Sequence, residues 1–166
     1  AENINTHTAL TTDFNTYYPA FGVDKGGTSP IIGQLFRFNV EKIGGNKHGL
    51  MSFGAGSSAN VLSGKGFIGA GTHGIYAFGA STVNASGANC SNAGNSGIYA
   101  TQTSTITANG ANCSNAGTYG ICVVNGSNVN AEGANCSNAG NSGMVALQGS
   151  IINAWGAIIQ NQTTGA

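Results

Sequence analysis

Charged side chains are scarce in this sequence. Only ten of its 166 residues are acidic or basic, five of each sign, so the formal net charge is zero. A chain so poor in Lys and Arg has no basic patch to neutralise phosphates and no polybasic stripe for a membrane surface. We therefore expect neither nucleic acid nor membrane as a partner.

Long hydrophobic runs and proline are also lacking. No apolar stretch approaches the roughly 20 residues that span a bilayer, and the chain holds 2 Pro. What it has instead is 28 Gly and 21 Asn, with many Ala, Ser and Thr. This composition is not typical of a globule with a large aliphatic core, and it favours either low complexity or a repeat.

A repeat is present. The segment GANCSNAG begins at Gly87, Gly110 and Gly133, so that each copy starts 23 positions after the previous one. A fixed period of this kind is the signature of a solenoid. The pattern extends forward to Gly156 and, more weakly, back to about residue 41. We predict a repeat region over residues 41–166, preceded by a cap or arm over residues 1–40.

Within one copy, apolar residues alternate with polar ones, as at Ile98 and Ala100 or Ile106 and Ala108, which predicts β-strands. Gly- and Asn-rich corners separate three short strands in each copy and argue against helices. Equivalent residues of successive coils should then lie about 4.8 Å apart and pair in parallel.

Residues 23 positions apart support this stacking because they are of the same or a similar type. The predicted inner columns and the corner column of Asn are Leu50, Ile75, Ile98, Ile121, Met144; Val83, Ile106, Val129, Ile152; Ala77, Ala100, Val123, Ala146; Ala85, Ala108, Ala131, Ala154; and Asn92, Asn115, Asn138, Asn161. The fold class is therefore all-β, a single-stranded parallel β-helix with 23-residue coils.

Over roughly residues 41–166, the recurring sequence pattern GANCSNAG…GIYA…STVNA resembles the repeats of bacteriophage tailspike and tail-fibre proteins. The β-helix of those proteins is right-handed. The resemblance implies a virion tail protein assembled in the host cytoplasm, with secretion as the alternative. It also implies a homotrimer that contacts bacterial surface polysaccharide. Because residues 163–166 carry no cap, we expect the chain to be a fragment of a longer one.

The positions of the cysteines in the repeat predict that they are core residues. Cys90, Cys113 and Cys136 share one column, with Phe67 before them and Ile159 after them. Their side chains should point the same way, which suits a disulfide poorly, and no His or Asp lies in the column to complete a zinc site. We expect free buried thiols, no metal and no cofactor.

Candidate catalytic groups are few. Glycoside hydrolysis needs two neighbouring carboxylates. Of the few acidic residues, we expect only Asp24 and Glu41 to meet within one chain, in its irregular N-terminal part, and acids from different subunits are the alternative pair. His48 and His73 occupy matching positions in adjacent coils, where we expect exposed corner residues. A capsular polysaccharide depolymerase, either a glycoside hydrolase or a polysaccharide lyase, is therefore the alternative function.

One outward face is unexpectedly apolar. We call it the apolar stripe; it runs along two columns, namely Met51, Tyr76, Tyr99, Cys122, Val145 and Phe53, Phe78, Val124, Leu147, the second interrupted by Thr101. Such a surface should be covered, either by the N-terminal segment or by a second copy. We favour a trimer interface at Tyr76, Phe78, Tyr99, Cys122, Val124, Val145 and Leu147.

The main hypothesis is thus a trimeric structural module that recognises host-surface glycan. The polar faces suit sugar hydroxyls, and Tyr17, Tyr18 and Trp155 are candidate stacking platforms for sugar rings.

Overall fold

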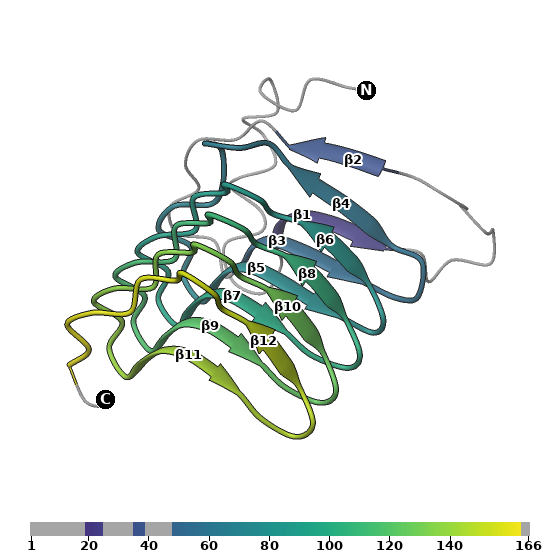
Figure 1. Ribbon diagram of the computed structural model, residues 1–166. Helices are drawn as coiled ribbons and strands as arrows, with labels where there is room; N and C mark the ends of the chain where they lie inside the picture. Colours follow the sequence, from purple (N-terminus) through teal and green to yellow (C-terminus); the bar gives the residue numbers. More distant parts are fainter. Residues whose placement is uncertain (1–18, 25–34, 39–47, 164–166) are drawn as a thin grey trace.

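The computed structural model describes residues 19–24, 35–38 and 48–163, which form an all-β parallel solenoid (Figure 1). Successive strands alternate between two six-stranded sheets. Sheet A contains β1 (Pro19–Asp24), β3 (His48–Phe53), β5 (His73–Phe78), β7 (Ser96–Ala100), β9 (Tyr119–Val123) and β11 (Ser142–Ala146). Sheet B contains β2 (Leu35–Phe38), β4 (Ser58–Val61), β6 (Thr82–Asn84), β8 (Thr105–Thr107), β10 (Asn128–Asn130) and β12 (Ile151–Asn153).

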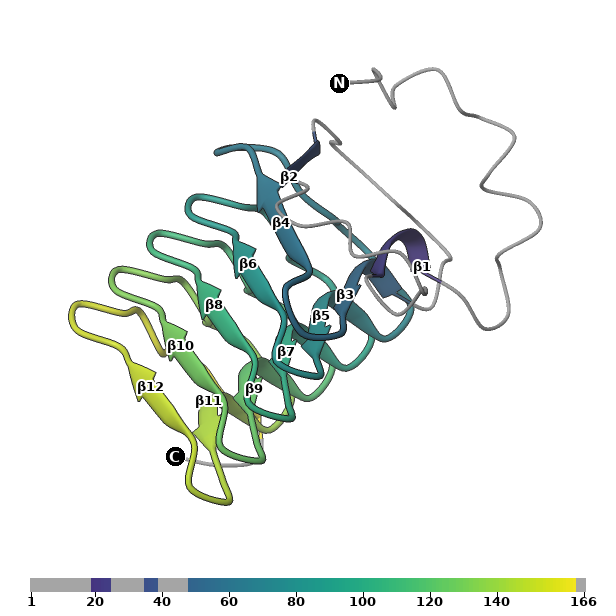
Figure 2. The ribbon, with the colours of Figure 1, turned by 90° about the vertical axis from the view of Figure 1, so that its right-hand side faces the viewer.

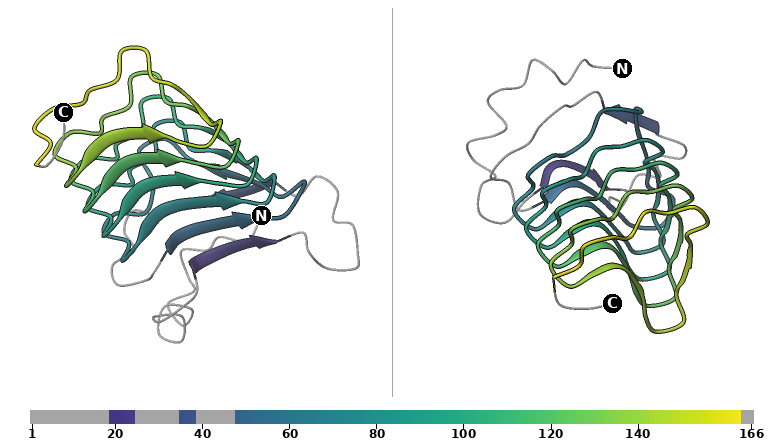
Figure 3. Two further views of the ribbon diagram at one scale, coloured as in Figure 1. Left: turned by 90° about the horizontal axis from the view of Figure 1, so that it is seen from below. Right: turned by 60° about the vertical axis from the view of Figure 1, so that its left-hand side comes forward.

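All strand pairs are parallel, and their register confirms the predicted stacking. Ile75 pairs with Ile98, Ile98 with Ile121, and Ile121 with Met144, so that each partner lies one repeat further along the chain. The strands of sheet A consequently lie side by side along the axis from purple to yellow (Figure 3, left), and those of sheet B do the same (Figure 2). The solenoid with 23-residue coils is therefore confirmed.

The third face of each coil is shorter than the sequence suggests. Instead of a strand, it contributes one bridging residue per coil, and the bridges link Gly66, Asn89, Asn112, Asn135 and Ile158 in order. Backbone hydrogen bonds continue this ladder, for example from Cys90 N to Asn112 O at 2.7 Å. The coil is closed by this ladder, although only two of its three faces carry strands.

Both sheets begin before residue 41. Phe21 of β1 pairs with Leu50 of β3, and Phe36 of β2 pairs with Ala59 of β4. Residues 19–24 and 35–38 thus add one strand to each sheet at the N-terminal end. A capping role for residues 1–40 stays a prediction.

The core is a narrow channel filled by the predicted columns. Ile75, Ile98 and Ile121 are completely buried, as are Val83, Ile106 and the small residues Ala85 and Ala108. In the last described coil, where no further coil packs, Met144 and Ile152 are only partly buried. Burial of each inward side chain therefore depends on coils on both sides of it.

A column of glycines lets the walls of this channel approach closely. A Cβ atom at Gly97 would lie 2.6 Å from Cβ of Cys113 and 2.9 Å from the carbonyl oxygen of Gly120. A Cβ atom added at Gly74 would likewise lie too close to Cβ of Cys90, and one added at Gly120 too close to Cβ of Cys136. Glycine is required here for space and not for backbone conformation, since none of these three residues has a positive φ.

All three corners of the coil use left-handed backbone conformations. At the corner between sheet B and the bridge face the residue is glycine, as at Gly87, Gly110 and Gly133 with φ of 64–67°. Asn92, Asn115, Asn138 and Asn161 have φ of 55–59°, a region that Asn tolerates better than most residues. Asn138 Nδ2 also donates to Asn115 Oδ1 at 3.1 Å, a rung of the expected Asn ladder. At the corner between sheets A and B, two residues per coil have positive φ, and from the coil of β5 onward they are consecutive, as Gln102 and Thr103 are at 54° and 61°.

The glycine column generates a stability prediction. Gly97→Ala should destabilise the fold by about 2–3 kcal/mol, because the added methyl overlaps Cys113 and the backbone of the next coil. Gly110→Asn is the matched control, because Gly110 has φ 65° with open space around it and Asn adopts that conformation. Urea unfolding followed by circular dichroism measures both changes; equal losses would contradict the close-approach argument.

The corner between sheets A and B predicts a substitution that stabilises the fold. Thr103 is β-branched yet has φ 61°, whereas the equivalent positions of the next coils are Gly126 and Gly149. Thr103→Gly should therefore stabilise the protein by about 1 kcal/mol, the cost of a left-handed non-glycine residue. Thr105→Gly, two residues further on in β8, should destabilise it, since glycine weakens strands. Thermal unfolding of the two variants tests the difference in sign.

Candidate functional site

The solenoid presents three outer faces that differ in chemistry, and its described part holds no helix that is long and apolar enough to cross a membrane. The outer face of sheet A carries the apolar stripe, with pairs such as Met51–Tyr76 and Tyr99–Cys122 in register. The outer face of sheet B and the bridge face are polar. Function is therefore considered face by face.

Aromatic rings cluster on sheet A over β3, β5 and β7. The His48 and His73 rings stack at 5.2 Å between centroids, and His73 stacks on Tyr99 at 4.7 Å. Tyr76 joins these rings to Phe78, which stacks on Phe53 at 5.3 Å. The parallel register produces this ladder, because it places equivalent side chains of adjacent coils one strand spacing apart.

The two histidines were expected to be exposed, and that prediction is wrong. His48 is 7% and His73 8% exposed, because each ring packs on Tyr76 and His73 also packs on Tyr99. Their adjacency was predicted correctly, since His48 pairs with His73. Burial also raises the pKa of Tyr76 and of Tyr99, so both phenols are neutral at physiological pH.

The remaining stripe residues become more exposed towards the C-terminal end. Cys122 and Val124 point outward but are buried within the single chain. Val145 is half-buried, and Leu147 is 52% exposed. The apolar surface that a partner would cover is therefore concentrated on the aromatic cluster and on the last described coil.

The outer face of sheet B is lined by hydroxyl and amide groups. Its first column contains Thr82, Thr105 and Asn128, followed in the last coil by Ile151, and all four are exposed. Its second column contains Asn84, Thr107, Asn130 and Asn153. Within the described chain, no side-chain hydrogen bond engages Thr82, Thr105, Thr107 or Asn128. Asn130 Oδ1 is buried there without a hydrogen-bond partner.

The bridge face has similar residue types, but its amides are already engaged. Asn112 Oδ1 accepts from Ser114 N at 3.1 Å, and Asn135 Oδ1 accepts from both N and Oγ of Ser137, at 3.1 and 2.7 Å. These two-residue turns satisfy the local backbone and side chains together. The bridge face consequently offers fewer open hydrogen-bonding groups than sheet B.

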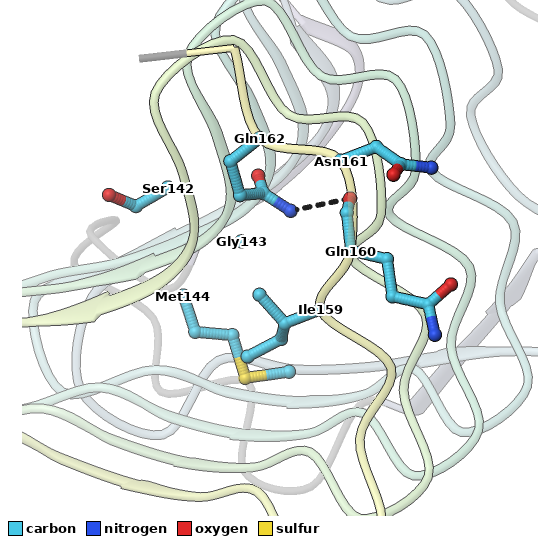
Figure 4. Close-up of a pocket in the computed structure, with 7 residues that line it drawn as sticks. All are labelled: Ser142, Gly143, Met144, Ile159, Gln160, Asn161 and Gln162. Atoms are coloured by element: carbon cyan, nitrogen blue, oxygen red, sulfur yellow. Dashed lines mark hydrogen bonds between the residues drawn. The ribbon is translucent and has the colours of Figure 1, made fainter. Parts of the chain in front are cut away.

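The C-terminal end of the solenoid is open and largely apolar. Trp155, a predicted stacking residue, is 81% exposed there, and Ile151 is 63% exposed. A pocket of about 580 Å³ lies against the last coil between Met144 and Ile159, with Gln162 donating to the Gln160 carbonyl at its rim (Figure 4). These groups border the site that a further coil would occupy.

The other predicted site residues are not brought together. Tyr17, Tyr18 and Glu41 lie outside the described residues, and Asp24 ends β1 opposite Phe53. Between residues 48 and 163 Glu132 is the only carboxylate, and its Oε1 accepts from Asn153 Nδ2 at 2.9 Å. No group of three or more His, Cys, Asp or Glu suited to a metal occurs within the described ranges.

All four cysteines are buried free thiols. Cys90, Cys113 and Cys136 lie in the core, whereas Cys122 lies on the outer side of sheet A. Burial raises the pKa of Cys90 to about 12 and that of Cys122 to about 11. A hydrogen bond with the Cys136 thiol, together with burial, raises the pKa of Cys113. Cys90, Cys113 and Cys122 are therefore protonated and unreactive at physiological pH.

No protein-family model, curated protein or solved structure matches this chain.

The raised thiol pKa values predict alkaline instability. Folding favours the neutral thiol, so its contribution is complete below the ordinary pKa of 9.0 and is lost as pH rises towards about 12. We expect the melting temperature to fall between pH 9 and pH 11, and Cys90→Ala to reduce that fall. A fall that is identical in both proteins would contradict the assignment.

Proposed function

We propose that this chain is a rigid module of a bacteriophage tailspike or tail fibre, which assembles as a homotrimer and recognises polysaccharide on the bacterial surface. The apolar stripe on sheet A carries the proposal, because it is an extended outward face whose composition differs from the polar faces beside it. A β-solenoid is compatible with such a role but serves many others. The division of faces makes the proposal specific to this chain.

The aromatic cluster and Leu147 supply the contact surface. Contiguous apolar patches of this kind are uncommon on monomers and mark interaction sites. Aromatic residues are enriched in protein interfaces, where their rings bury a large area. The neighbouring copy would contribute a different surface, so that the contacts close into a ring about a threefold axis.

The small apolar area of the core favours association of the chain with other copies. Its columns are built largely of Ala, Val and Cys, which remove little apolar area from water per residue. Lateral packing of three solenoids adds buried area without changing the coil. The free thiols also suit assembly in a reducing cytoplasm better than oxidative secretion.

With sheet A turned inward, the outer face of sheet B and the bridge face would point to solvent. Their Asn, Ser and Thr side chains both donate and accept hydrogen bonds, as sugar hydroxyls require. The trimer would thus present polar, nearly uncharged faces to host glycans.

The oligomeric state tests the assembly. Light scattering at micromolar concentration should give about three times the chain mass of 16.5 kDa. Leu147→Glu should shift the protein to the monomer, because a charge within the stripe must be desolvated in the interface. A wild-type monomer would overturn the assembly.

Ile151→Glu is the matched control. Ile151 belongs to the same last coil and is at least as exposed as Leu147, but it lies on sheet B. This variant should remain trimeric. If it dissociates as Leu147→Glu does, the interface involves the C-terminal end and not the stripe.

A further inference from the structure

We infer that the outer face of sheet B, from β6 to β10, binds an uncharged polysaccharide laid along the solenoid axis. This inference rests on the proposed function and adds to it the binding face and the chemical class of the ligand. The relevant groups are the two outward columns of β6, β8 and β10, which follow one another along the axis (Figure 2).

Open hydrogen-bonding capacity in the first outward column distinguishes this face from the bridge face. In the second column, Asn84 already accepts from Ser86 and Asn153 donates to Glu132. Thr82, Thr105 and Asn128 are exposed, and no hydrogen bond within the described residues engages their side chains. On the bridge face, by contrast, Asn112 and Asn135 are engaged by Ser114 and Ser137. A ligand rich in hydroxyls therefore gains more hydrogen bonds on sheet B.

Asn130 supplies a second, independent indication. Its Oδ1 atom lies on this face, is buried, and lacks a hydrogen-bond partner among the described residues. An acceptor in that state costs free energy until a donor reaches it. A rotation of the amide towards a ligand hydroxyl would recover that cost in the complex.

The parallel register gives the face a regular period. Thr82 pairs with Thr105, which pairs with Asn128, and the second column runs from Asn84 through Thr107 to Asn130. Equivalent groups therefore recur about every 4.8 Å along the axis. A polymer of similar units can make similar contacts on successive coils, whereas a compact ligand would use only one or two.

Charge selects the class of polymer. Lys65 and Glu132 are the only formally charged side chains between residues 48 and 163. Glu132 lies beside this face, where its carboxylate accepts from Asn153. An acidic glycan would lose hydration without gaining a cationic partner and would be repelled by Glu132. The face therefore favours neutral sugars.

The test uses the full chain and immobilised, purified bacterial polysaccharides, with uncharged O-antigens compared with capsules that contain uronate. We expect binding to at least one uncharged polymer. Its affinity should change less than about twofold between roughly 50 and 500 mM NaCl, since no ion pair forms. Binding only to uronate polymers, weakened by salt, would overturn this inference and leave glycan recognition standing; binding to none would overturn both.

Two threonine variants locate the face. Thr105→Ala should weaken binding of the uncharged polymer about three- to tenfold, the value of one hydrogen bond. Thr118→Ala is the matched control, because Thr118 lies at the corner before β9 and outside both sheets. Equal affinities of the two variants and the wild type would exclude sheet B as the binding face.

Discussion

Backbone hydrogen bonds between residues one coil apart hold this structure together, and every other feature must respect their register. A slip of one residue would turn inward side chains outward along a whole strand. The constant coil length avoids this. Two coils near the N-terminal end are longer. Phe21 pairs with Leu50, six positions beyond the regular spacing, and Leu50 pairs with Ile75, two positions beyond it. In the second of these coils, the surplus is absorbed outside the strands, on either side of β4. The sheets consequently continue in register into β1 and β2.

The same register makes the core narrow and its residue sizes interdependent. Where Gly97 faces Cys113, the two walls are too close for a second side chain, so glycine stands opposite each of the buried residues Cys90, Cys113 and Cys136. A thiol fits this space as a small apolar group. Its burial then accounts for the raised pKa of Cys90, so packing and chemical inertness have one cause.

Sequence alone predicted what depends on period and alternation, and missed what depends on distance across the coil. The columns of Ile75 and Val83 follow from spacing alone. The glycine column is visible in the sequence, because glycine stands directly before an apolar residue in every coil, as in Gly97-Ile98 and Gly120-Ile121. Spacing does not reveal, however, that these glycines face the opposite wall of the coil. The burial of His48 and His73 depends on ring orientations across coils, which spacing does not specify.

The difference between the two polar faces has the same origin in local geometry. At the bridge face an Asn precedes a Ser by two residues in a turn, so its side-chain oxygen reaches the Ser backbone, as Asn112 does at Ser114. In β8, Thr105 and Thr107 are also two residues apart, but the strand is extended and both side chains stand away from the backbone. The threonines of β8 are therefore open, whereas an Asn that precedes a Ser by two residues in a turn is engaged, as Asn112 is on the bridge face and Asn84 is at the end of β6. The local backbone, and not the composition alone, determines which polar side chains remain open.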